Sequence, residues 1–493
     1  MKYLGILDIL AKIGGRLPTV VRPKQTQPLG RRLIWTGIVL IIYLVMAQTP
    51  LYGVQPGQAA TSILARLYIM QIIFASNIGT LMELGIGPIV TAGLIMQILV
   101  GAKLLKLDLS NIEDRKKFTE AQKVLALLVG LLEATLLTVS WHWNPSMRLL
   151  VPWYVKLVVI LQLVIATYIV MLLDEMMQKG WGLGSGVSLF ILAGVASRVF
   201  WLMFTPLPLK TIGAESGLEF TQQVNLAAPL GFIPYVIWGV LNGVSFNDVV
   251  LRYAQYRTPD GTMQIMQLPD LIGFISTLGI IAVLVYLEGM KVEIPVTSQR
   301  LRGIRTRVPL KFLYVTNIPI LLVGILYSDL QLFLYIAGSV GGRALAEPLS
   351  LILRYMRVPL GPLELVYDPL RVLIYALIWG GLAVLFGLLW VEIAGLSPAQ
   401  QAENLVRSGL EIPGIRRNIK ILERILAKYI YPLTILSSII VATIAIVANI
   451  LGAYGSGTGL LLAVGIIYQY YMMIAYERTL EAYPMLKRLL GEE

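Results

Sequence analysis

The sequence contains no cysteine, and its 493 residues include only one histidine. Disulfide bonds and thiolate metal sites are therefore excluded, and the usual residue sets of zinc enzymes and thiol nucleophiles are missing. The single histidine, His142, lies in WHWNP at the end of an apolar segment, which favours an interfacial position over catalysis. The GxxxxGK[ST] phosphate loop is also absent. We expect no cofactor, no metal and no enzymatic activity.

Charged residues are scarce as well, at 14% of the chain, whereas hydrophobic residues make up 57%. Soluble domains are not this apolar along their whole length. Apolar runs of about 20 residues recur, which is typical of membrane-spanning helices, and the alternating segments of a transmembrane barrel are missing. The sequence predicts an all-α polytopic membrane protein with ten transmembrane helices, at roughly 33–49, 80–101, 121–141, 151–173, 184–204, 270–288, 311–328, 370–391, 431–451 and 458–477.

The basic residues decide the orientation. Lys and Arg number 40 against 28 Asp and Glu, so the formal net charge is +12. If the N-terminus is cytosolic, 29 of the 40 basic residues fall in cytosolic segments, as the positive-inside rule requires. Ten spans then return the C-terminus to the cytosol. We expect a multi-pass membrane protein with both termini in the cytosol; the family resemblance given below implies that the membrane is a prokaryotic cell membrane.

The spans divide the chain into five parts. Residues 1–32 are expected to form a cytosolic interfacial segment and 33–204 the first five-helix half. An outer insertion at 205–269 contains GFIPYVIWGVLNGV, which is too short and too interrupted by Pro and Gly to span easily. The second half covers 270–477, with a further outer segment at 329–369, and 478–493 is a cytosolic tail.

An internal repeat relates the two halves. GLGSG (182–186) opens the fifth span and GSGTG (455–459) opens the tenth, while Pro88 and Pro319 interrupt the second and seventh. Corresponding spans run in opposite directions, so the halves form an inverted repeat. Interrupted helices at corresponding positions of inverted repeats indicate a pathway along the pseudo-symmetry axis.

The residues themselves leave several functions open. A secondary carrier with inverted repeats is one alternative, and Glu133 in the third span is its best support, although a structural hydrogen bond would explain this residue equally well. A membrane insertase or scaffold without a pore is another. Aliphatic side chains occupy the interrupted positions and could form a dewetting constriction or simply pack helices.

The second span is poorly suited to anchoring a chain. Residues 79–99 hold four glycines, Pro88 and Glu83, and each interior Gly costs roughly 1 kcal/mol and a Pro about 3 in a helix. The composition alone leaves open what the chain gains from so marginal a helix.

In five stretches the chain resembles the SecY family, the large subunit of the Sec protein translocase, in its archaeal form. The resemblance extends in order over nearly the whole chain and is carried by SNIGTLMELGIGPIVTAGLIMQILVGAKLL (76–105), LDEMMQKGWGLGSGVSLFILAGV (173–195), EGMKVEIPVTSQRLRGIRTRVPLKFLYVTNIPILL (288–322), WVEIAGLSP (390–398) and LGAYGSGTGLLLAVGIIYQYY (451–471). It departs from the family in the insertion at 205–269 and at Thr316, where Ser is common.

The resemblance implies a pore-forming subunit that moves unfolded polypeptides across the membrane and releases apolar segments sideways into the bilayer. The implied pore ring comprises Ile86, Val90, Leu183, Val187, Leu321 and Leu461. The last position could instead be shifted by one residue, to Leu460 or Leu462. Spans two and seven, flanked by three and eight, would form a lateral gate with Gln122 and Asn317 as polar gate residues. A plug is implied at about 68–78, with Tyr68, Ile72, Ile73 and Ile78 as its residues.

The same resemblance implies partners. Small single-span subunits similar to SecE/γ and to β/SecG are expected, together with a ribosome or another cytosolic motor, signal-bearing nascent chains and membrane lipid. The implied ribosome-docking residues are Arg300, Arg302, Arg305, Arg416 and Arg417. Topology charge and anionic lipid would alone explain many of these arginines.

Overall fold

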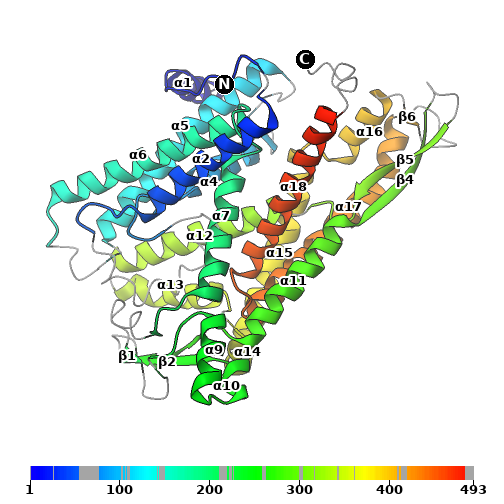
Figure 1. The fold of residues 1–493 in the computed structure, drawn as a ribbon. Coiled ribbons are helices and arrows are strands. Elements are labelled where there is room, and N and C mark those ends of the chain that lie inside the picture. The colour runs from blue at the N-terminus through cyan, green and yellow to red at the C-terminus, as the bar shows by residue number, and fades with distance from the viewer. Residues whose placement is uncertain are drawn as a thin grey trace.

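The computed structural model describes residues 2–25, 27–54, 77–101, 104–105, 107, 111–141, 143, 150–209, 219–220, 225, 227–257, 263–298, 304–315, 317–340, 343–359, 361–407, 410–411 and 419–482. Within these ranges most residues are helical, which confirms the predicted mainly α-helical class. Figure 1 shows a layered bundle of long helices with small extensions at opposite ends.

Among the described residues, eight helices are long and apolar enough to cross a membrane: α2 (Leu29–Gln48), α5 (Ile112–Ser140), α6 (Trp153–Gln178), α7 (Gly186–Phe204), α11 (Leu271–Gly289), α15 (Pro369–Ile393), α17 (Ile419–Ile450) and α18 (Gly457–Ala482). Two further apolar helices, α4 (Gly87–Gly101) and α12 (Asn317–Val340), occupy the places predicted for spans two and seven. The ten helices agree with the predicted number of spans. Helix α4 has 15 residues and is the shortest of the ten, and α4 and α12 carry Pro88 and Pro319 in their first turns.

The seventh helix differs from the prediction at its outer end. The apolar pattern indicated an end near 328, but α12 continues to Val340, so Asp329 lies inside the helix instead of in an outer loop. The carboxyl group of Asp329 accepts a hydrogen bond from the hydroxyl of Thr91 on α4 (2.9 Å). A partner on a neighbouring helix lowers the cost of this charge within an apolar element.

Two three-stranded antiparallel sheets were not expected. One contains β1 (Glu219–Phe220), β2 (Tyr253–Arg257) and β3 (Met263–Gln267), and the other contains β4 (Lys291–Ser298), β5 (Ile304–Lys311) and β6 (Leu410–Glu411). Figure 1 places the first sheet at the end opposite to the second. Both sheets lie in the connections between membrane helices, so the bundle itself remains helical.

Short helices complete the two ends. The outer connections form α9 (Phe232–Asn242), α10 (Phe246–Val250), α13 (Arg343–Met356) and α14 (Pro362–Tyr367), and the cytosolic ones form α1 (Lys2–Gly14) and α16 (Pro398–Arg407). With 11 residues, α9 is too short to cross a bilayer. Leu7 and Ala11 of α1 are buried, and Leu7 packs with Met96 of α4 and Ala121 of α5. The amphipathic N-terminal helix is therefore held against the first half.

The interior consists of two large apolar clusters. One is built mainly from α2, α4, α6 and α7, with α18, and the other mainly from α11, α12, α15, α17 and α18, with parts of α5 and α6. Helix α4 packs against α12, and α7 packs against α18. These are the pairs that the internal repeat relates, so the interrupted helices of the two halves meet each other in the interior.

Candidate functional site

The segment that leads into α4 is irregular and fixed by polar contacts. Residues 77–86 form turns, with positive φ angles at Gly79 (74°) and Gly85 (54°). The carboxylate of Glu83 is buried and accepts hydrogen bonds from the backbone N–H of Gly79 and from the indole Nε1–H of Trp143 (3.2 Å). Glu83 is therefore the polar support of this turn. Such a left-handed backbone explains why glycine is present at both turn positions.

The six predicted ring residues lie at or near the starts of α4, α7, α12 and α18. Ile86, Leu183 and Leu461 are buried at 1%, 1% and 3% exposure, whereas Val90, Val187 and Leu321 are half-buried. Ile86 belongs to the cluster of the first half and Leu461 to that of the second.

Two of the six side chains lie where the halves meet. Val90 of α4 and Leu321 of α12 pack against both apolar clusters, and Val187 packs against the cluster that contains Ile86. Leu183 stands just before α7, where its backbone N–H donates to Oγ1 of Thr36 on α2 (3.0 Å). The structure thus brings Val90 and Leu321 together with members of both halves. Leu460 and Leu462 are buried too, so burial alone does not single out Leu461.

The predicted gate helices are in direct contact. Helix α12 packs against α4 and α5, and α15 packs against α4. Gln122 of α5 lies across Gly93 of α4, because a Cβ added at Gly93 would stand 3.0 Å from Nε2 of Gln122. Asn317 is the first residue of α12, and its side chain lies outside the described part. The glycine leaves room for the amide between the two helices.

A second polar group at this interface was missed by the sequence analysis. Thr91 and Asp329 join α4 to α12, and the carboxyl group of Asp329 acts electrostatically on the buried Glu133 of α5. Oε1 of Glu133 and Oδ1 of Asp329 have no hydrogen-bond partner among the described residues. Three gate helices therefore share one buried polar cluster. A helix prediction that ran past residue 328 would have placed Asp329 in the span.

Little of the predicted plug is described. Tyr68, Ile72 and Ile73 lie outside the described residues. Ile78, at the end of the predicted plug, is half-buried and packs against the cluster of the second half. The N–H of the nearby Leu51 donates to the carbonyl of Gly79 (2.9 Å), which ties the end of α2 to this turn.

The two basic cytosolic loops are joined through a sheet. Strand β4 pairs with β5 of its own loop and with β6 of the other, where Thr297 faces Glu411 and Ser298 faces Leu410. Arg305 is opposite Thr297 in the β4–β5 register. The other predicted docking residues, Arg300, Arg302, Arg416 and Arg417, lie outside the described residues. The β4–β6 pairing nevertheless brings the two loops side by side.

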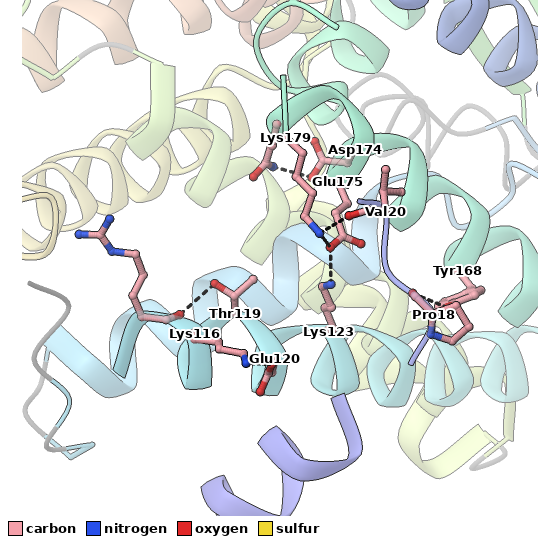
Figure 2. Close-up of polar contacts among 12 residues, drawn as sticks. Pro18, Val20, Lys116, Thr119, Glu120, Lys123, Tyr168, Asp174, Glu175 and Lys179 are labelled. Atoms are coloured by element: carbon pink, nitrogen blue, oxygen red, sulfur yellow. Dashed lines mark hydrogen bonds and ion pairs between the residues drawn. The ribbon is translucent and has the colours of Figure 1, made fainter. Parts of the chain in front are cut away.

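A charged cluster fastens the cytosolic ends of α5 and α6 (Figure 2). Oε1 of Glu175 lies 2.6 Å from Nζ of Lys123 and 2.7 Å from Nζ of Lys179. The extended segment that follows α1 crosses this region, where the carbonyl of Pro18 accepts a hydrogen bond from the hydroxyl of Tyr168 (2.9 Å). Lys179 also donates to the carbonyl of Val20. These contacts attach the N-terminal segment to the bundle.

In the part of the chain that the structure describes, no three His, Cys, Asp or Glu side chains gather in a way that could hold a metal ion. A small cavity of about 10 Å³, large enough for one water molecule, is lined by Leu284, Glu288, Leu313, Val441, Leu461, Val464 and Gly465. Apolar packing dominates the region around the interrupted helices.

Comparisons with known proteins agree with this geometry. The SecY family model matches residues 80–471, and the model described as "Plug domain of Sec61p" matches residues 41–79. The chain is 49% identical to "Protein translocase subunit SecY" of Aeropyrum pernix over 99% of this chain and 100% of the relative. It is 34% identical to "Protein transport protein SEC61 subunit alpha" of Debaryomyces hansenii over 97% of each.

Solved structures show the same likeness. "The structure of a protein conducting channel" matches with a TM-score of 0.73 and 32% identity, over 96% of this chain and 98% of the other. "Sec61 in the Canine ribosome-channel complex from the endoplasmic reticulum" matches with a TM-score of 0.71 and 31% identity, over the same shares.

Proposed function

Because this chain belongs to the SecY family and is a protein-conducting channel subunit of a cell membrane, we propose which of its residues form the pore, the gate and the docking surface. The family assignment rests on the family match and on relatives that cover the full chain. The carrier alternative finds no support, since the relatives and the solved structures are protein translocation channels.

The proposed constriction is the ring of Ile86, Val90, Leu183, Val187, Leu321 and Leu461. The observation that carries it is the position of Val90 and Leu321, which pack against the apolar clusters of both halves at once. Ions cannot shed their water into an aliphatic constriction, whereas flexible side chains can deform around a passing polypeptide. In the closed state of the pore, we expect these six side chains to meet and exclude water.

The proposed gate opens between α4 and α5 on one side and α12 and α15 on the other. Thr91 and Asp329 join the two sides and would set the balance between the closed and open states, while Gln122, the polar gate residue on α5, packs over Gly93 and holds one side together. We assign Asn317 to the polar gate residues as well, because it lies at the start of α12. An apolar segment in the open gate partitions into lipid because Leu and Ile each gain a few tenths of a kcal/mol there, while Lys or Asp costs roughly 2.5–3.5 kcal/mol.

The channel provides a path for the polypeptide and no energy of its own. We place ribosome docking on the paired β4–β6 loops, because one of the similar solved structures is that of Sec61 in a ribosome-channel complex. Guanidinium groups suit this task since they bind phosphate oxygens bidentately. We expect small subunits similar to SecE/γ and β/SecG in the assembly, and residues 68–78 as the plug.

A crosslinking experiment tests the ring. The chain has no cysteine, so a single Val90→Cys substitution introduces one reactive thiol. A nascent chain stalled during translocation and carrying a thiol-reactive probe should crosslink to position 90. The matched control is Val283→Cys on α11, whose side chain is exposed on the bundle surface. Equal crosslinking at both positions, or none at position 90, would refute the assignment.

A further inference from the structure

The same three residues lead into helices α7 and α18. Gly-Ser-Gly occupies 184–186 and 455–457, and its third glycine is the first residue of each helix. The first glycine has a positive φ angle in each case, 68° at Gly184 and 85° at Gly455. The third glycine touches the backbone of the preceding helix. A Cβ would stand 2.7 Å from Cα of Asp174 if added at Gly186, and 2.1 Å from the carbonyl oxygen of Ala445 if added at Gly457. Each helix start is thus wedged onto the membrane helix before it.

The start of α7 is capped by a side chain of that preceding helix. Oδ1 of Asp174 on α6 accepts hydrogen bonds from the backbone N–H of Val187 (3.1 Å) and from the hydroxyl of Ser185 (3.0 Å), and Oδ2 accepts from Nε2 of Gln178 (2.7 Å). The side chain of Ser185, at the N-cap position, does not cap α7 itself. A buried carboxylate at a helix N-terminus satisfies free N–H groups and interacts favourably with the helix dipole.

The start of α18 uses a neutral acceptor in the same way. Oδ1 of Asn449, near the end of α17, accepts a hydrogen bond from the backbone N–H of Gly457 (2.7 Å). Oγ of Ser456 accepts another from the N–H of Gly459 (3.1 Å). Asn449 is buried, as Asp174 is. In both halves, a buried side chain of the preceding helix therefore caps the interrupted helix start, Asp174 in the first half and Asn449 in the second.

We propose that Asp174 and Asn449 are positioning residues that hold the starts of α7 and α18 so that Val187 and Leu461 stay in the constriction. The proposal rests on the ring of the proposed function. Val187 provides both the N–H bound by Asp174 and an aliphatic ring side chain. Leu461 lies about one helical turn beyond Gly457, so a contact that holds Gly457 in place also determines which way the side chain of Leu461 points.

The test is the resting ion conductance of purified full-length chains in planar bilayers. Asp174→Ala and Asn449→Ala should each raise the resting conductance by about tenfold, since an uncapped helix start leaves buried N–H groups unsatisfied. Asp174→Asn should stay near the parent because an amide oxygen can still accept from Val187, as Asn449 does at the other start. Glu175→Gln is the matched control, since it changes the neighbouring carboxylate, which pairs with Lys123 and Lys179 instead. It should conduct like the parent.

A leak-positive variant separates the possible failures. Val187→Asp places a charge in the ring itself and should conduct ions. If it leaks while folded Asp174→Ala and Asn449→Ala remain tight, the positioning role is refuted and the ring stands. If Val187→Asp is also tight, the ring is refuted. If Asp174→Ala does not fold, Ser185→Ala replaces it and should raise the leak by a smaller factor; a tight, folded Ser185→Ala then counts against the proposal.

Discussion

The hydrogen bond between Thr91 and Asp329 ties one side of the proposed gate to the other, so its removal should make the gate easier to open. Thr91→Val keeps the shape of the side chain and deletes the hydroxyl that donates to Oδ2 of Asp329 over 2.9 Å. The other carboxyl oxygen, Oδ1, has no hydrogen-bond partner within the described ranges, so the substitution leaves this buried group poorly satisfied.

The magnitude follows from interhelical hydrogen bonds in membranes, which contribute about 0.6 kcal/mol on average and at most about 1.7. The population ratio of open to closed gates should therefore rise by roughly three- to twentyfold. Weak signal segments, whose binding energy barely opens the parent gate, should gain most. Strong signals already open it and should change little.

The assay compares translocation of one reporter carrying a weak or a strong signal segment in cells or proteoliposomes. The matched control is Thr135→Val on α5, because the hydroxyl of Thr135 bonds only the carbonyl of Leu131 in its own helix (2.6 Å). We expect the weak-to-strong ratio to rise for Thr91→Val and to stay at the parental value for Thr135→Val. Equal ratios for two folded variants would refute a role of this bond in gating.

Three further perturbations test other contacts. Asn317→Leu should change the free-energy difference between the closed and open gate by about 1 kcal/mol, or roughly fivefold in population. If weak and strong signal segments are translocated as by the parent, Asn317 is excluded from the gate. Gly101→Val should push α4 away from α15, because a Cβ at 101 would stand 2.4 Å from Cγ1 of Ile393. The unfolding free energy should therefore fall by about 1–3 kcal/mol. An unchanged melting temperature would contradict this packing. The double substitution Arg305→Glu and Arg416→Glu should weaken ribosome binding without a loss of folding, and ribosome binding to the parent should weaken as the salt concentration rises. If a sedimentation assay finds an affinity that neither salt nor the substitutions change, these arginines serve only as topology signals.

The sequence predicted the membrane helices well because hydropathy alone determines them. The interrupted starts of α4, α7 and α18 were also visible, since glycines that require a positive φ angle, such as Gly85 and Gly184, stand out in apolar runs. The length of α12 was not visible, because Asp329 reads as the end of an apolar span until its partner Thr91 on another helix is known.

The sheets and the capping contacts were missed for different reasons. Strand β4 does alternate apolar residues at Val292, Ile294 and Val296, a period-two signal that the basic charge of the loop obscured. The role of Asp174 could not be read from the sequence, because its partners Ser185 and Val187 come close only when α7 folds back onto α6. Side-chain contacts between elements depend on packing, which periodicity does not specify.

The central claim is that six aliphatic side chains at the interrupted helix starts keep the resting channel closed to ions. Val90→Asp with Val187→Asp tests it most directly, by single-channel conductance of the folded double variant in a planar bilayer. Two carboxylates would hold water in the constriction and attract cations, so the account predicts a resting conductance far above that of the parent. A folded double variant as impermeable to ions as the parent would contradict the account.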